Sequence, residues 1–147
     1  MTARKKTYAV RLATLLGNRQ SGAREGAQWH NRILEGLTFE AVERVKARAS
    51  LTDAEVARLL GIGEATLRRA RASGSALDAA TSDRLYRLSK AIAIAEDVLE
   101  GPENAMSWLR RSQPGLAGCV PLELLVTQAG ADQVETLLRR IDFGVYA

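Results

Sequence analysis

The stretch that decides the fold reads Thr52-Asp-Ala-Glu-Val-Ala-Arg-Leu-Leu-Gly-Ile-Gly-Glu-Ala-Thr-Leu-Arg-Arg-Ala-Arg-Ala-Ser-Gly74. Its first four residues fit a capping box, in which the Thr52 hydroxyl and the Glu55 carboxylate each accept a hydrogen bond from a backbone amide at a helix start. This helix is expected to end at Gly61, and residues 61–63 then turn into a second helix that stops at Gly74. Two short helices joined by a tight, glycine-containing turn predict a helix-turn-helix.

The second helix of this motif has an arginine-rich outward face. Leu67 and Ala70 are expected to face the core, which leaves four neighbouring residues on or beside the outward face. An outward arginine can make a two-pronged hydrogen bond to guanine or neutralise a phosphate. The alternative is an ordinary helical hairpin with solvated arginines, but the capping box, the turn and the positive helix together favour DNA binding. The candidate DNA-binding residues are Thr66, Arg68, Arg69 and Arg71.

The composition of the whole chain indicates an all-α protein. The 147 residues suit one domain or two very small ones, and a hydrophobic content of 46% can fill a core. Ala, Leu, Arg and Glu dominate, while Val and Ile never cluster into alternating runs. This composition is typical of a folded protein and not of a chain that is disordered throughout.

The charge balance permits nucleic acid or an acidic partner without deciding between them. Lys and Arg number 21 against 17 Asp and Glu, which leaves a net charge of +4. Most of the cations are arginine, the residue favoured for planar contacts to phosphate, carboxylate or guanine. The alternative is that a GC-rich genome alone explains the arginine content.

The residue types that carry catalysis or bind metals are scarce. Cys119 and His30 are single, so the sequence predicts no disulfide, no metal site and no cofactor. Glu96 and Asp97 are adjacent and would point to different sides of a helix, so no enzyme is expected. Arg11 interrupts the apolar run near the start, and no stretch approaches the roughly 20 apolar residues of a membrane span. We therefore expect a cytoplasmic protein with no membrane contact.

The regions on either side of the motif divide the chain into four parts. Residues 1–36 are expected to be a basic, mobile or weakly docked arm with short helices at 8–16 and around Trp29. Thr38 is expected to cap the first helix of the DNA-binding domain, residues 37–76. A long helix over residues 77–100 carries two apolar stripes, so it must be covered on both sides, either as a central core helix or as a dimer seam.

The C-terminal part, residues 101–147, predicts further short helices and an apolar tail. Pro121 is expected to start a helix that Gly130 closes, and Asp132 to cap the last helix. The apolar pattern then continues to the final residues of the sequence, where Phe143 and Tyr146 need a surface on which to dock. That surface is either the protein's own core or a partner.

Several motifs in order resemble the Xre/MbcA/ParS family of antitoxins over residues 37–147. They are Thr66-Leu-Arg-Arg, Ser82-Asp-Arg-Leu-Tyr-Arg-Leu, Ala105-Met-Ser-Trp-Leu, Leu116-Ala-Gly-Cys-Val-Pro-Leu-Glu-Leu-Leu and Val134-Glu-Thr-Leu-Leu-Arg-Arg-Ile-Asp-Phe-Gly-Val-Tyr. The resemblance implies an N-terminal Xre-like helix-turn-helix bundle followed by a small helical toxin-binding domain.

The resemblance also implies a partner and a mechanism. The partner would be a RES-domain toxin that consumes NAD or uses it to modify a target protein. The antitoxin would cover the toxin's active site, bind operator DNA to repress its own operon, and form a homodimer within a larger complex. The alternative is a dimeric helix-turn-helix regulator without a toxin. In the toxin-binding hypothesis two arginines pair with acidic groups, apolar side chains fill the entrance, and the C-terminal carboxylate approaches basic residues. The residues are Arg139, Arg140, Phe143, Gly144, Val145, Tyr146 and Ala147.

Overall fold

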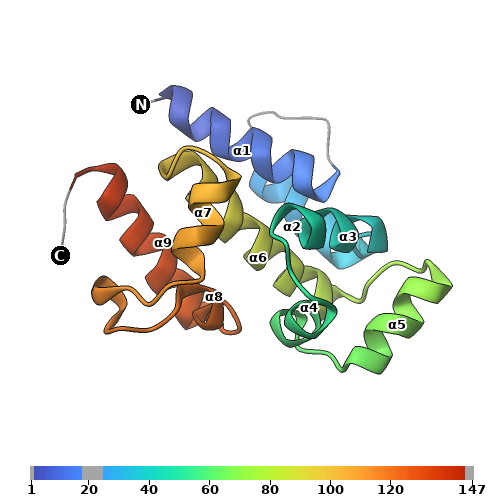
Figure 1. Cartoon of the computed structure of the whole chain (residues 1–147). Helices are drawn as coiled ribbons and strands as arrows, with labels where there is room; N and C mark the ends of the chain where they lie inside the picture. The colour runs from blue at the N-terminus through green and yellow to red at the C-terminus, as the bar shows by residue number, and fades with distance from the viewer. Residues whose placement is uncertain (1, 18–24, 145–147) are drawn as a thin grey trace.

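The computed structural model describes residues 2–17 and 25–144, and every regular element in these ranges is helical (Figure 1). The prediction of an all-α fold is confirmed. None of these helices combines the length and the apolar character needed to cross a membrane. The elements are α1 (Thr2–Leu16), α2 (Glu25–Glu35), α3 (Phe39–Arg48), α4 (Asp53–Leu60), α5 (Glu64–Ser73), α6 (Ala79–Val98), α7 (Pro102–Leu109), the 3₁₀ turn η1 (Pro114–Leu116), α8 (Pro121–Leu124) and α9 (Gln128–Asp142).

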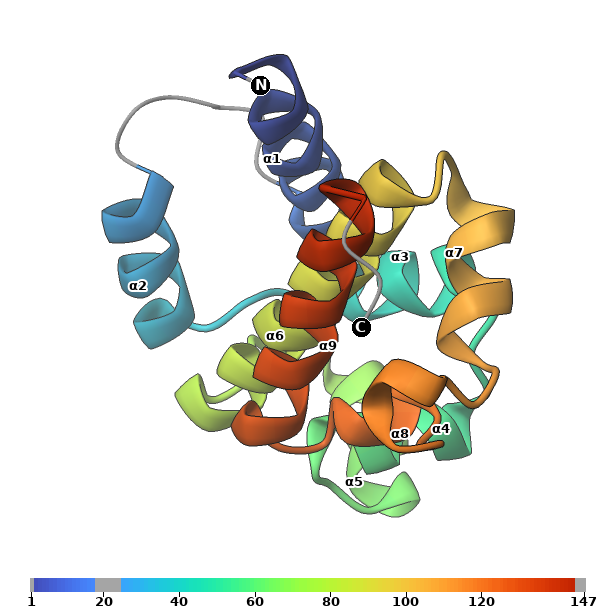
Figure 2. The ribbon, with the colours of Figure 1, turned by 90° about the vertical axis from the view of Figure 1, so that its left-hand side faces the viewer.

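Helix α6 is the centre around which the other helices pack. The Asp78 side chain caps it by accepting a hydrogen bond from the Thr81 backbone amide at 2.7 Å. Both apolar stripes are buried, with Leu88 and Ile92 each 1% exposed and Ile94 4% exposed. Helices α1, α2, α4, α7 and α9 pack around α6, and Figure 2 shows α9 crossing it. Within the described residues, both apolar stripes of α6 are thus covered by other helices of the same chain.

The N-terminal arm is not weakly docked, and this part of the sequence interpretation was wrong. Leu12 and Leu16 of α1 are 2% and 1% exposed, and Trp29 of α2 is 6% exposed. The Arg44 Nε atom donates a hydrogen bond to the Leu15 carbonyl at 3.0 Å, which satisfies an acceptor at the C-terminal end of α1. The two arm helices contribute to the same core as α6, and α1 begins six residues before the expected residue 8.

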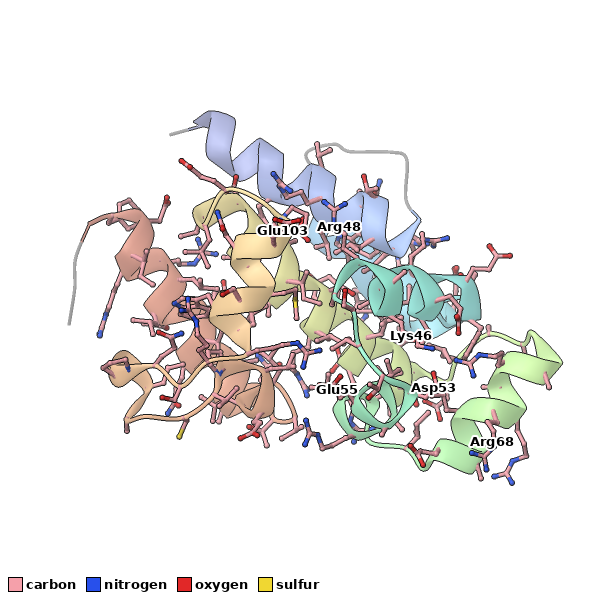
Figure 3. All side chains as sticks on the ribbon, viewed as in Figure 1. Lys46, Arg48, Asp53, Glu55, Arg68 and Glu103 are labelled. Carbon is pink, nitrogen blue, oxygen red and sulfur yellow. The ribbon has the colours of Figure 1, made fainter. Side chains whose placement is uncertain are left out.

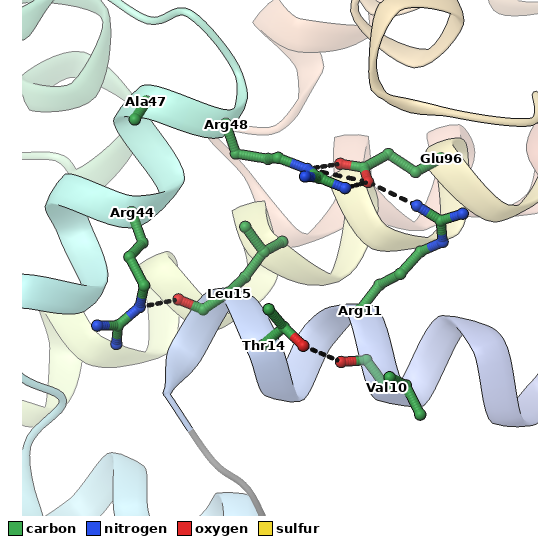
Figure 4. A pocket seen from close by; sticks show the side chains of 8 residues that line it. All are labelled: Val10, Arg11, Thr14, Leu15, Arg44, Ala47, Arg48 and Glu96. Atoms are coloured by element: carbon green, nitrogen blue, oxygen red, sulfur yellow. Dashed lines mark hydrogen bonds and ion pairs between the residues drawn. The ribbon is translucent and has the colours of Figure 1, made fainter.

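A buried carboxylate joins α1 and α3 to α6. The Glu96 side chain is 1% exposed and accepts hydrogen bonds from Arg11 Nη1 at 2.9 Å and from Arg48 Nη2 at 2.8 Å (Figure 4). The hydrogen bonds to Glu96 raise the pKa of Arg48. A buried charge is tolerated only when it is paired and hydrogen-bonded, so the two arginines and the glutamate form one unit.

The last helix starts earlier than the sequence suggested. Thr127 is the N-cap, its hydroxyl accepting from the Gly130 amide at 3.0 Å, whereas Asp132 lies inside the helix and accepts from Gln128 Nε2 at 2.8 Å. Gly130 does not close a helix. It lies in the first turn of α9, where a Cβ atom would collide with the Leu124 carbonyl oxygen, so the glycine allows α8 and α9 to approach closely.

One ion pair connects the C-terminal helices with the first helix of the helix-turn-helix. Arg110, just after α7, donates from its two terminal nitrogens to the Glu55 carboxylate at 2.7 and 3.1 Å and to the Ser50 carbonyl at 3.1 Å. The Arg110 hydrogen bonds lower the pKa of Glu55 from 4.5 to about 2. Glu55 therefore serves both the cap of α4 and the contact between α4 and α7.

The cluster at Glu96 predicts a specific pattern of stability changes. Replacing both Arg11 and Arg48 by Met leaves the Glu96 carboxylate, which is 1% exposed, without its two charged partners. This change should lower the free energy of unfolding by about 3–5 kcal/mol. Adding Glu96→Leu to the double variant should recover most of the lost stability, because an apolar side chain at this position needs no charged partner. Urea unfolding of the three proteins measures the pattern, and a triple variant less stable than the double variant contradicts it.

The Arg110 contact predicts a stability difference that depends on pH. The folded pKa of Glu55 is depressed, so the stabilisation is complete above about pH 5 and is lost as the pH falls toward 2. Arg110→Met should therefore cost about 1 kcal/mol at pH 7, and this cost should shrink in acid. Thermal unfolding of both proteins across this pH range tests the prediction. A cost that is equal at pH 7 and pH 3 contradicts it.

Candidate functional site

The helix-turn-helix forms where the sequence predicts it. The Glu55 amide donates to the Thr52 hydroxyl at 3.1 Å and the Thr52 amide donates to the Glu55 carboxylate at 3.0 Å, so the capping box is confirmed. Gly61 ends α4 in the left-handed conformation, with φ of 69°. The Leu60 carbonyl at this turn accepts a hydrogen bond from Arg84 of α6 at 3.5 Å. Sequence reasoning missed this support of the turn, although Arg84 lies in one of the motifs that carry the family resemblance.

Helix α5 presents a positive face to solvent. Its N-cap, Gly63, is extended and provides no side-chain hydrogen bond, and Leu67 is its buried residue. Thr66, Arg68 and Arg69 are exposed, and Figure 3 shows Arg68 directed away from the body of the molecule. Arg69 donates to the Thr66 hydroxyl at 3.2 Å, and neither arginine has a carboxylate partner among the described residues. These two guanidiniums are free to meet an external anion.

Arg71 lies differently from the other three predicted DNA-binding residues. We expected it on or beside the outward face, but its guanidinium pairs with Asp53 of α4 at 2.8 Å and Glu43 of α3 at 2.9 Å. It also lies over the Phe39 ring, 5.5 Å from the centroid. The Arg71 hydrogen bond, reinforced by Lys46, holds the pKa of Asp53 far below its usual range. Arg71 therefore holds α5 against α3 and α4.

The end of α9 presents a second exposed surface. Val134 and Leu138 are buried on the inner side of the helix, whereas Arg140 is exposed and Phe143 is 63% exposed. Arg139 is also exposed but donates to Glu135 of its own helix at 2.7 Å. Phe143 therefore does not pack on the protein's own core, which had been one of the two expectations for it. Of the other predicted toxin-binding residues, Gly144 is exposed, and Val145, Tyr146 and Ala147 lie outside the described residues.

The two exposed surfaces lie at opposite ends of the molecule. Helix α5 projects at one end, and the C-terminal end of α9 lies at the other (Figure 1). One large apolar side chain with arginines beside it is typical of a protein-binding surface, in which an aromatic anchor supplies most of the affinity. A positive helix following a tight turn is typical of DNA recognition. The geometry thus suits two different partners.

Comparison with known proteins divides the chain into two domains, one for each exposed surface. Residues 28–90 match the model of the antitoxin Xre-like helix-turn-helix domain, and residues 95–144 match the antitoxin Xre/MbcA/ParS C-terminal toxin-binding domain. The first match begins inside α2. It therefore includes part of residues 1–36, for which we found no resemblance to the family from the sequence alone. A helix-turn-helix joined to a toxin-binding domain indicates a regulator and not an enzyme.

Whole proteins with similar sequences carry related names. Antitoxin Xre of Yersinia enterocolitica is 28% identical over 116 residues, 78% of each chain, and Prs ADP-ribosylating antitoxin of Sphingobium sp. is 28% identical over 124 residues, also 78% of each. Antitoxin Xre of Pseudomonas putida is 30% identical over 115 residues, which cover 78% of this chain and 71% of that protein. Taken with the two matching domains in order, this similarity shows that the protein belongs to the Xre/MbcA/ParS family of antitoxins.

Proposed function

We propose that this protein is the antitoxin of a type II toxin-antitoxin pair and neutralises a RES-domain toxin that consumes NAD. The observation that carries the proposal is the exposed Phe143, which ends the helix α9 inside the match to a toxin-binding domain. Exposing a phenylalanine to water is unfavourable, and the cost is recovered when a partner covers it. The ADP-ribosylation in the name of the Sphingobium relative supports NAD chemistry, because ADP-ribose is transferred from NAD.

In this proposal the end of α9 covers the entrance of the toxin's active site. Phe143 fills an apolar entrance, while Arg140 pairs with an acidic group of the toxin. Arg139 forms an exposed ion pair with Glu135 of its own helix. In the complex it would instead pair with an acidic group of the toxin. We place Gly144, Val145, Tyr146 and Ala147 in the same contact, because they follow Phe143 in the sequence.

We also propose that α5 binds operator DNA and represses the protein's own operon. Arg68 and Arg69 are exposed without carboxylate partners, and Thr66 lies beside them, so these three residues make the direct contacts. Arg71 is left out of this set because Asp53 and Glu43 already neutralise it. Helix-turn-helix proteins commonly read two half-sites as dimers, so we propose a homodimer on DNA within a larger toxin-antitoxin complex in the cytoplasm.

The DNA proposal predicts a change in salt dependence. Arg68→Ala and Arg69→Ala should each weaken operator binding, by about 1–3 kcal/mol where the arginine contacts a base. Where it contacts a phosphate, the slope of log K against log salt concentration should fall by about one. Fluorescence anisotropy with labelled operator DNA between low and physiological salt measures both quantities.

Two control variants make this experiment specific. Arg111→Ala removes another exposed arginine, far along the chain, and should leave the salt slope unchanged. Arg71→Met should lower the melting temperature but not the slope, provided that binding is measured well below unfolding. If Arg71→Met reduces the slope while Arg68→Ala and Arg69→Ala do not, the assignment of the DNA-binding face is wrong.

The toxin proposal predicts that Phe143 dominates neutralisation. Phe143→Ser should weaken toxin binding roughly 30-fold or more, the loss of a hot-spot side chain, without unfolding the protein, because the ring is 63% exposed. The matched control is Leu34→Ser, which removes an apolar side chain 61% exposed on α2. Cellular NAD is measured in cells that produce the toxin encoded beside this gene together with each variant.

The outcomes separate the toxin proposal from its alternative. NAD should fall with Phe143→Ser and remain protected with Leu34→Ser. Full protection by both variants would show that the end of α9 is not the inhibitory contact. A neighbouring gene product that leaves NAD unchanged when produced alone would favour a helix-turn-helix regulator without an NAD-consuming partner.

A further inference from the structure

A pocket of about 490 Å³ lies where α1, α3 and α6 meet, separate from α5 and from the end of α9 (Figure 4). Its apolar walls come from Val10 and Leu15 of α1 and from Ala47 of α3. Pockets of this volume, apolar with a few placed polar groups, are typical of small-molecule sites. Neither the DNA-binding nor the toxin-binding proposal uses this pocket.

The charged groups of the pocket are unbalanced in favour of positive charge. Three guanidiniums, those of Arg11, Arg44 and Arg48, line it together with a single carboxylate, that of Glu96. Glu96 is 1% exposed and is already held by Arg11 and Arg48, so it cannot also neutralise Arg44. The pocket therefore has an excess of about two positive charges beside its apolar walls.

Several donor atoms of these arginines remain unused. The hydrogen bond from Arg44 to the Leu15 carbonyl employs Nε, and its two terminal nitrogens have no acceptor among the described residues. Arg11 Nε is buried and has no acceptor in the described chain either. A guanidinium offers five N–H donors in a planar fork that suits a carboxylate. An anionic group entering the pocket would satisfy donors that the protein leaves free.

We propose that this pocket binds a small amphipathic organic anion, a carboxylate carried on a short apolar chain. The carboxylate lies at the terminal nitrogens of Arg44, and the chain lies along Val10, Leu15 and Ala47. Because these groups belong to both α1 and α3, the ligand fastens the N-terminal helix to the DNA-binding domain. Binding to the folded form raises the melting temperature by linkage.

The test uses three small molecules that have the same alkyl chain but different head groups. Octanoate, octanamide and octylamine share their apolar chain, but octanoate is an anion, octanamide is neutral and octylamine is a cation at pH 7. Isothermal titration of the full-length protein should show one octanoate per chain. Octanamide should bind at least tenfold more weakly, and octylamine should not bind. A parallel rise in melting temperature should occur with octanoate alone.

Two variants locate the binding. Arg44→Met keeps the apolar stem and removes the head-group contact, so octanoate should bind at least tenfold more weakly, at about the affinity of octanamide. Ala47→Phe fills the pocket from an exposed position and should abolish binding, whereas Ala129→Phe, at an exposed position of α9, should not. Circular dichroism confirms that each variant is folded.

Three results overturn the proposal. The first is the absence of saturable octanoate binding at millimolar concentration. The second is equal affinity for all three probes, which would show a site without charge selection. The third is unchanged octanoate binding in folded Ala47→Phe, which would place the site elsewhere.

Discussion

Helix α6 is apolar on more than one side, and the rest of the structure depends on the need to cover it. Leu88 and Ile92 lie on one side of the helix and Ile94 on another, and all three are nearly inaccessible to solvent. Helices from the N-terminal arm, the helix-turn-helix and the C-terminal region all pack against it. The matches to the two family domains end at residue 90 and begin at residue 95, both inside α6. The helix-turn-helix domain and the toxin-binding domain therefore share one hydrophobic core.

Two groups of arginines in this protein have different physical roles. Arg11, Arg48, Arg71 and Arg110 are paired with carboxylates of other helices, and they hold α1, α3, α5 and α7 in place. Arg68, Arg69 and Arg140 are exposed without such partners in the described chain. Net charge alone does not distinguish these groups, because only the fold shows which carboxylates lie nearby. Both candidate interfaces contain arginines whose charge is not paired with a carboxylate of another helix among the described residues.

Local rules predicted the local features of this protein. The capping box at Thr52 and Glu55 and the turn at Gly61 depend on residues within one or two helical turns, so their sequence spacing was sufficient. The docking of α1 could not be read in this way. Its arginine at position 11 interrupts an apolar run, and only the distant Glu96 explains why that charge is tolerated beside the core. Arg71 was misplaced for the same reason, since its partners lie 18 and 28 residues away.

Gly130 shows a further limit of sequence reasoning. A glycine near the end of an apolar run usually marks a helix end, but here the requirement is close packing of α8 against α9. A helix end and close helix packing both favour glycine, so the presence of a glycine does not show which of the two it serves. The exposed Phe143 was easier to identify, because an apolar pattern that continues past the buried face of the last helix needs a covering surface.

The shared core holds the two exposed surfaces at opposite ends of one molecule, with α5 at one end and the end of α9 at the other (Figure 1). Amide hydrogen exchange of the protein alone, with operator DNA and with the toxin tests this account most directly. We predict that DNA slows exchange in α5, that the toxin slows exchange at the end of α9 around Phe143, and that neither changes the slowly exchanging centre of α6. Protection of the same helix by both partners, or no change around Phe143 with the toxin, would contradict the account.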